Sequence, residues 1–138
     1  HVLPQFILRA AQAIAATPSG PVPFPIQGDG SQTRAFIHVD DFTDGIMCML
    51  AGGEHLNIYH IGNPQEITIR EVATKVVGYL GREARIMEGP APAGATPRRC
   101  PDIGKLAALG FRPRISFDQG LPSIADWYAA RAAEERAR

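Results

Sequence analysis

Four prolines between residues 18 and 25 limit the elements that the first part of the chain can form. Proline has no backbone N–H, fixes its own φ and pushes the preceding residue out of the helical region. We therefore expect Val2 to Ala16 to be a largely buried helix that ends before this stretch, with Pro4 tolerated in its first turn. Pro23 to Gln27 should be extended and should lie at a sheet edge, since prolines cannot donate to a ladder.

The later elements are expected to be short, because glycines and prolines interrupt the apolar patterns. The patterns predict strands at Thr33 to Val39, Leu56 to Ile61 and Ala84 to Glu88, and helices at Asp41 to Leu50, Thr68 to Leu80, Asp102 to Gly110 and from Ser116 onward. The fold class predicted is α/β: a small mixed unit of three to five short strands and four or five helices, without a long run of alternating strands and helices.

Polar residues mark where the helices should begin. Asp40 or the residue before it is expected to cap the second helix, whose acidic first turn suits the helix dipole. Thr68 and Glu71 have the spacing of a capping box, and Ser116 opens the last helix in the same way. Pro122 lies past the first turn of that helix, so it should distort the helix or delay its start.

Composition excludes several functional classes. The chain has 138 residues, a formal net charge of zero and no apolar run near the length of about 20 residues that spans a bilayer. Long-range attraction to nucleic acid or to an anionic membrane is therefore not expected. Two cysteines are too few for a disulfide framework, which favours a reducing, cytoplasmic setting. The chain opens on His1 inside an expected helix, which suggests a piece of a longer protein.

The stretch Gly28 to Asp41, GDGSQTRAFIHVDD, allows three interpretations: a metal site, a phosphate-binding loop or a turn. A metal would need His38 on a strand to converge with aspartates that begin a helix, and helix capping explains those carboxylates better. A phosphate-binding loop would need its glycines to lead into a helix and a lysine to follow, and neither condition is met. A hairpin turn between two strands is the preferred interpretation.

Arg34 is not explained by a turn. Strand alternation places it on the face of Phe36, where its stem could cover apolar surface or its guanidinium could bind a phosphate or carboxylate. Serines lack an evident base and the four histidines are scattered, so the sequence predicts no catalytic residue and no metal site.

Two ordered blocks resemble the C-terminal, substrate-binding portion of NAD-dependent epimerase/dehydratases, the extended short-chain dehydrogenase/reductases (SDRs) that act on nucleotide sugars. The first block is GDGSQTRAFIHVDDFTDG, from Gly28 to Gly45. The second runs from Arg99 through RCPDIGK, LGFRP and SFDQGL, and is similar to the family's R-x-P-D-x-x-K, L-G-[WF]-x-P and S-x-x-x-G-L pattern. The resemblance covers nearly the whole chain, residues 1–138.

The resemblance implies that this chain is the substrate-binding lobe, lacking most of the Rossmann domain that holds NAD and the catalytic groups. It implies that Arg34 binds the diphosphate of a nucleotide sugar and that Arg99 makes a second contact to phosphate or ribose. Gln27 would stand beside the nucleotide, and the segment His1 to Phe6, including Gln5, would line its pocket. The implied partners are a nucleotide-diphosphate sugar and an N-terminal Rossmann domain or partner chain, within a homodimer.

The chain departs from the family at its chemistry. It has no glycine-rich fingerprint, and none of its tyrosines has a lysine four residues on, so the catalytic Tyr-x-x-x-Lys pair is absent from these residues. No cofactor-binding residue is therefore predicted here. Two functions remain open: part of an NAD-dependent nucleotide-sugar epimerase, dehydratase or decarboxylase, or a stand-alone or degenerate module that binds a nucleotide sugar without catalysis.

Overall fold

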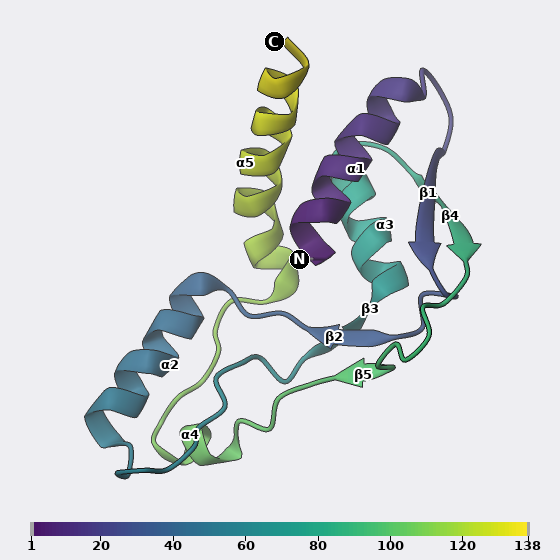
Figure 1. Cartoon of the computed structure of the whole chain (residues 1–138). Coiled ribbons are helices and arrows are strands. Elements are labelled where there is room, and N and C mark those ends of the chain that lie inside the picture. Colours follow the sequence, from purple (N-terminus) through teal and green to yellow (C-terminus); the bar gives the residue numbers. More distant parts are fainter. Residues whose placement is uncertain (1, 138) are drawn as a thin grey trace. The chain divides into compact units, whose positions relative to one another are not determined.

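The computed structural model describes residues 2–137, with side chains for residues 2–134. His1, predicted to lie at the nucleotide pocket, is outside the described residues. The chain divides into two compact units. Unit 1 comprises residues 1–32, 68–97 and 121–138, and unit 2 comprises residues 33–67 and 98–120. The five strands and five helices of the described chain agree with the predicted small α/β class (Figure 1).

Unit 1 packs helices against a parallel pair of strands. It contains α1 (Val2–Ala16), β1 (Val22–Gln27), α3 (Ile69–Tyr79), β4 (Ala84–Gly89) and most of α5 (Phe117–Ala137). The register of β1 and β4 runs from Val22 opposite Ala84 to Gln27 opposite Gly89. Figure 1 shows α1 and α3 together beside this pair. The core consists of apolar side chains from α1, β1 and α3, among them Ile7, Val22, Phe24, Val72, Val76 and Val77.

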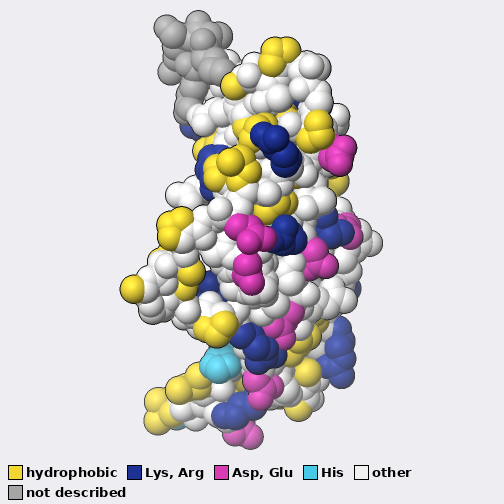
Figure 2. All heavy atoms as spheres, turned by 90° about the vertical axis from the view of Figure 1, so that its right-hand side faces the viewer, with side chains coloured by type: hydrophobic (Ala, Val, Ile, Leu, Met, Phe, Trp, Pro, Cys, Tyr) yellow, Lys and Arg dark blue, Asp and Glu magenta, His cyan; other side chains and the backbone are white. Residues whose placement is uncertain are grey.

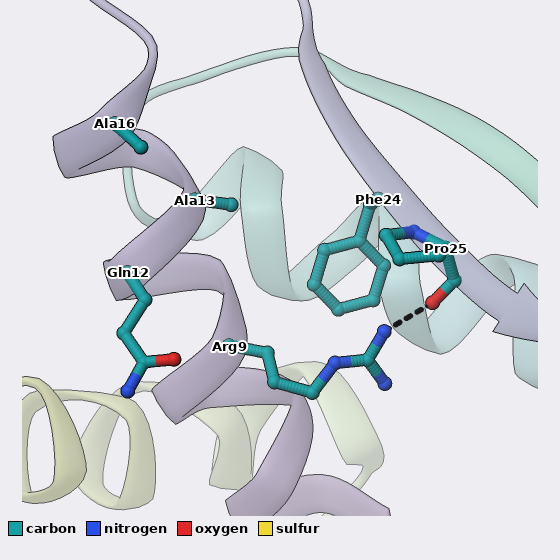
Figure 3. A pocket seen from close by; sticks show the side chains of 6 residues that line it. All are labelled: Arg9, Gln12, Ala13, Ala16, Phe24 and Pro25. Atoms are coloured by element: carbon teal, nitrogen blue, oxygen red, sulfur yellow. Dashed lines mark hydrogen bonds between the residues drawn. The ribbon is translucent and has the colours of Figure 1, made fainter.

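The side chain of Arg9, on α1, contacts residues of β1. Its guanidinium lies 4.9 Å from the centre of the Phe24 ring and 5.5 Å from that of Phe6, and it donates a hydrogen bond to the carbonyl oxygen of Pro25. Figure 3 shows this contact at the edge of an open cavity of about 350 Å³. Since Phe24 is buried and Arg9 is already paired with a ring and a carbonyl, this cavity is explained by the packing of α1 on β1.

Unit 2 is built on a three-stranded sheet. It contains β2 (Thr33–Ala35), α2 (Val39–Gly52), β5 (Arg98–Arg99), α4 (Gly104–Ala108) and nearly all of β3 (Glu66–Thr68). The strand order is β3-β2-β5, and β2 and β5 are parallel. Leu106 and Phe111 form its buried apolar centre, close to the glycine Gly45 of α2.

Several predicted elements are confirmed. The bounds of α1 are as predicted, although only one face of the helix is buried. The capping box of Thr68 and Glu71 opens α3, and Gly81 follows it with a φ of 82°. The second box is present too, since the amide of Ser116 donates to Gln119 at 2.9 Å and the amide of Gln119 donates back at 3.3 Å.

The predicted hairpin at Gly28 to Gly30 is wrong, because β1 and β2 belong to different sheets. The turn is held by other elements. The Gly28 amide donates to the carbonyl of Gly89 at 3.0 Å, and the Gly30 carbonyl accepts the amide of Arg70, at the start of α3, at 3.0 Å. Gly30 has a φ of 80°, and a Cβ there would lie 2.5 Å from the Ile26 side chain. The glycines thus join β1 to β4 and α3 and do not close a two-stranded ladder.

Other boundaries also differ from the predictions. The strand predicted at Thr33 to Val39 has only three residues, and residues 56–61 form no strand. The cap of α2 is His38, whose side chain accepts the Asp40 amide, so neither Asp40 nor Val39 is the cap. The helix predicted from Asp102 to Gly110 is shortened to α4. Pro122 does not delay α5, which begins five residues before it. Among the described residues, no helix is long and apolar enough to cross a membrane.

Candidate anion-binding site on the sheet of unit 2

Two of the predicted site residues, Arg34 and Arg99, lie directly opposite each other. They are partners in the parallel register of β2 and β5, one residue after the partners Thr33 and Arg98. Residues opposite each other in a sheet project to the same face, and neighbouring strands lie about 4.8 Å apart. Arg34 is half-buried and donates to the Thr33 carbonyl at 2.6 Å, while Arg99 is exposed. The fold therefore brings together two arginines that are 65 positions apart in the sequence.

Glu66 of β3 pairs with the neighbouring arginine, Arg98. Arg98 Nη2 and Nε donate to Glu66 Oε1 at 2.6 and 2.9 Å, and the Thr33 hydroxyl donates to Oε2 at 2.6 Å. The hydrogen bond from Arg98, and then that from Thr33, lowers the pKa of Glu66 below its ordinary value. The same hydrogen bond raises the pKa of Arg98. These contacts hold the three strands in register beside Arg34 and Arg99.

Arg34 and Arg99 have no carboxylate partner among the described residues, whereas Arg98 takes the one nearby carboxylate. Like charges opposite each other on adjacent strands repel. On the face in Figure 2, Lys and Arg side chains are interspersed with Asp and Glu side chains. Two arginines at partner positions of adjacent strands, without a carboxylate partner in the described chain, therefore favour an anion with several oxygens, because a guanidinium can donate two parallel hydrogen bonds.

Arg99 also lines an open depression of about 660 Å³ in unit 2. The other lining residues are mostly apolar or aromatic: Ala35, Phe42, Tyr59, His60, Ile61, Cys100 and Pro101. Ala35 and Cys100 follow the two paired arginines, so strand alternation directs them to the opposite face of the sheet. Arg99 nevertheless lines the depression, whereas Arg34 is not among its lining residues.

The acidic end of GDGSQTRAFIHVDD is structural. Asp41 is fully buried, and its Oδ2 accepts the backbone amides of Arg114 at 3.0 Å and Ile115 at 2.8 Å. The Nδ1 of His38 accepts the amide of Asp40. No group of three potential metal ligands is found in the part of the chain that the structure describes. The side chains that suggested a metal are thus used in capping α2 and in holding the loop before α5.

The remaining predicted site residues, Gln27 and Gln5, belong to unit 1 and are exposed. The Gln27 carbonyl accepts a hydrogen bond from the Gln32 side chain at 2.8 Å. Their predicted contacts to a nucleotide stay predictions.

The contribution of Glu66 and Arg98 was missed in the sequence. A usable signal was present: consecutive residues on a strand point to opposite faces, so only one of Arg98 and Arg99 can share a face with Arg34. The other then requires its own counter-charge, which Glu66 supplies.

The described residues do not fit NAD. A dinucleotide site needs a glycine-rich turn that leads from a strand into a helix N-terminus. The turn at Gly28 to Gly30 leads into β2, and the Gly30 carbonyl accepts the amide of Arg70 at the start of α3.

Known proteins resemble the chain in sequence and in fold. The family model "NAD dependent epimerase/dehydratase family" matches residues 1–62. GDP-L-fucose synthase 1 of Arabidopsis thaliana is 38% identical over 93% of this chain and 39% of its own length. UDP-glucuronic acid decarboxylase 2 of the same plant is 39% identical over 72% of this chain and 22% of its own length.

Among solved structures, the chain is similar to DesIV, the dTDP-glucose 4,6-dehydratase of Streptomyces venezuelae with NAD and TYD bound. The TM-score is 0.79 at 32% identity, over 97% of this chain and 40% of that one. The chain thus spans about two fifths of the length of these relatives at most. By sequence and by fold, the chain belongs to the NAD-dependent epimerase/dehydratase family of extended SDRs.

Proposed function

We propose that residues 1–138 are the substrate-binding lobe of an NAD-dependent nucleotide-sugar epimerase, dehydratase or decarboxylase. The observation that carries the proposal is the cross-strand pair of Arg34 and Arg99, which lacks a carboxylate partner within the described part of the chain. The relatives are named for a GDP sugar, a UDP sugar and a dTDP sugar. Their common group is a diphosphate, which is the kind of anion that two adjacent guanidinium groups bind best.

In this proposal Arg34 binds the diphosphate and Arg99 makes the second contact, to phosphate or ribose. Glu66 neutralises Arg98, so that the third arginine does not compete for the ligand. Gln27 and Gln5 are proposed to contact the nucleotide. Binding energy from the diphosphate is remote from the reacting sugar carbon, and it serves to hold that carbon in place for the reaction.

Hydride transfer with NAD and proton transfer at the sugar are assigned to residues outside this chain, in a Rossmann domain. We propose that the complete enzyme is a cytoplasmic homodimer, as the resemblance implies.

Calorimetric titration of the 138-residue chain with GDP, UDP and dTDP tests the site. Arg34→Ala and Arg99→Ala should each weaken binding of the preferred diphosphate by about 10- to 100-fold, or roughly 1.5–3 kcal/mol, because each removes a charge-assisted contact. Arg85→Ala is the control, since Arg85 is an exposed arginine on β4 of unit 1.

The corresponding nucleoside monophosphate should bind more weakly to the unchanged chain and should lose less affinity on either substitution. Equal affinity of Arg34→Ala and the unchanged chain for all three diphosphates would refute the assignment of Arg34. No measurable binding of any diphosphate would refute the proposed function of the chain.

A further inference from the structure

The sheet of unit 2 contains more arginines than carboxylates. Strands β2, β3 and β5 together contain Arg34, Arg98 and Arg99, and their one acidic residue is Glu66. Its Oε1 accepts Arg98 Nη2 at 2.6 Å and Nε at 2.9 Å, while its Oε2 accepts the Thr33 hydroxyl at 2.6 Å. The carboxylate cancels the charge of Arg98, so the net charge that the sheet offers to a ligand is that of Arg34 and Arg99.

The pairing of Glu66 with Arg98 is well defined. The Glu66 side chain is 26% exposed, and a guanidinium that donates two hydrogen bonds to one carboxylate is among the stronger ion pairs in proteins. Thr33 and Arg98 are partners in the register of β2 and β5, so the backbone holds the two donors together. The hydrogen bond from Arg98 also lowers the pKa of Glu66, which keeps the carboxylate ionised at neutral pH.

Without Glu66, the charge of Arg98 would act on a ligand bound at Arg99. The two arginines are consecutive on β5, with Cα atoms about 3.8 Å apart, and their side chains project to opposite faces of the same sheet. The distance from Arg98 to such a ligand is comparable with the Debye length of about 10 Å in 0.1 M salt, so the interaction would be only partly screened. The ligand would then meet a third positive charge.

We propose that Glu66 is a specificity-determining residue: by neutralising Arg98 it limits the site to two positive charges, which favours a diphosphate esterified at both ends over one with a free terminal phosphate. This role rests on the proposed function, in which Arg34 and Arg99 bind the diphosphate. A diphosphate esterified at both ends, as in a nucleotide sugar, has one negative charge on each phosphate. A nucleoside diphosphate has an additional charge, because its terminal phosphate loses a second proton at about pH 6. Specificity is a difference between affinities, and the absence of a third cation weakens binding of the more highly charged nucleotide more than that of the nucleotide sugar.

Calorimetric titration of the 138-residue chain with matched ligand pairs tests the role of Glu66. The pairs are UDP-glucose with UDP, GDP-L-fucose with GDP and dTDP-glucose with dTDP, at about pH 8 so that the terminal phosphate is ionised. In about 0.02 M salt, Glu66→Gln should strengthen binding of the nucleoside diphosphate about two- to fivefold more than binding of its nucleotide sugar, as one added charge predicts. The difference should vanish in about 1 M salt, where the Debye length falls to about 3 Å.

Two further variants separate the charge of Glu66 from its structural role. Adding Arg98→Gln to Glu66→Gln returns the charge of the site to two, so the ratio of the two affinities should return to that of the unchanged chain. Glu54→Gln is the matched control, since it removes the same charge from an exposed glutamate of unit 2. Glu54 follows the end of α2, a helix roughly 20 Å long that begins after β2, so this variant should leave the ratio unchanged.

The possible results distinguish the role of Glu66 from the proposed function. If neither ligand of any pair binds, both are refuted. If the ligands bind and Glu66→Gln leaves the ratio of affinities unchanged in low salt, only the role of Glu66 is refuted. That role is also refuted if the double variant keeps the altered ratio, because Glu66 then acts through the geometry of the strands and not through the charge of Arg98.

Discussion

Asp41 is the buried charge of unit 2, and its role is to fix a loop. Both amides that it accepts belong to the residues just before α5, more than 70 positions away in the sequence. An ionised carboxylate that accepts two backbone hydrogen bonds compensates for its burial, but each amide becomes unsatisfied if the carboxylate is removed. Asp41 therefore stabilises the segment Arg114 to Ser116 more than it stabilises its own helix.

Asp41→Ala should lower the free energy of unfolding by about 1–3 kcal/mol, because it leaves two partly buried amides without an acceptor. Asp40→Ala is the control, since the Asp40 side chain is 73% exposed in the same turn of α2. It should cost less than about 1 kcal/mol. Urea denaturation followed by circular dichroism measures both, and equal effects would show that Asp41 acts only through the helix dipole.

Glu66 makes the stability of unit 2 dependent on pH. Its pKa is lowered in the folded chain, chiefly by Arg98, so the folded state favours the ionised form. That contribution is complete above the unfolded pKa of about 4.3 and is lost as the pH falls through the lower folded pKa. Glu66→Gln should therefore reduce the urea midpoint at pH 7, and the difference from the unchanged chain should shrink as the pH falls below the unfolded pKa of glutamate.

The control for this titration is Glu83→Gln, which alters an exposed glutamate just before β4. It should leave the pH dependence of the urea midpoint unchanged. If Glu66→Gln lowers the urea midpoint as much at pH 3 as at pH 7, the variant loses stability through packing and not through the ion pair with Arg98.

At the residue scale, the sequence identified the arginines of the candidate site but not the partners of the acidic residues Asp41 and Glu66. Arg34 and Arg99 were found because their motifs resemble those of a family. Asp41 was assigned to helix capping, and its actual hydrogen-bond partners are the amides of Arg114 and Ile115, which no local pattern reveals. Glu66 was missed because its partners Arg98 and Thr33 are more than 30 positions away along the chain.

At the scale of elements, local signals were reliable. The capping box of α3 requires only four consecutive residues, and the structure contains both of its hydrogen bonds: the Glu71 amide donates to the Thr68 hydroxyl at 3.1 Å, and the Thr68 amide donates to the Glu71 carboxylate at 2.9 Å. The carboxylate is ionised there more readily than usual, because the backbone bond from Thr68 lowers its pKa. Such interactions form within one turn and are readable from the sequence.

Thr68→Ala should lower the free energy of unfolding by about 1 kcal/mol, because it removes the cap of α3. Thr74→Ala is the control: Thr74 is an exposed residue within the same helix, and its hydroxyl donates back to the Arg70 carbonyl. Alanine has the higher helix propensity, so this variant should be neutral or slightly more stable. Thermal unfolding of the pair measures the difference, and similar losses in both would rule out the capping contribution.

Strand pairing was the part that the sequence did not reveal. The turn Gly28 to Gly30 has the composition of a hairpin, but the choice of partner depends on β4 and α3, which lie 40 or more positions later. The strand predicted at residues 56–61 is absent for a related reason. An alternating pattern indicates a tendency to form a strand, but a ladder also requires a second strand. Both errors concern contacts that are distant in sequence.

At the scale of the whole molecule, the buried apolar side chains are unevenly divided. Of the sixteen buried hydrophobic residues in the described chain, only Leu106 and Phe111 lie in unit 2. Unit 2 is instead held by polar contacts, such as those of Asp41, Glu66 and Asn63. Apolar burial contributes about 25 cal/mol per Å², so a unit with few buried side chains has little stability of its own.

We therefore expect unit 2 to open before unit 1. In native-state hydrogen exchange, the amides of α3, whose Val72, Val76 and Val77 are buried in unit 1, should exchange only through global unfolding. The amides of α2 in unit 2 should exchange through a local opening with a free energy lower by about 1.4 kcal/mol or more, which is at least a tenfold difference in rate. Low concentrations of urea should accelerate exchange in α3 more steeply than in α2, because global unfolding exposes more surface. Identical protection and identical urea dependence in the two helices would mean that both units unfold as one cooperative body, and that the polar contacts of unit 2 stabilise it as well as an apolar core does.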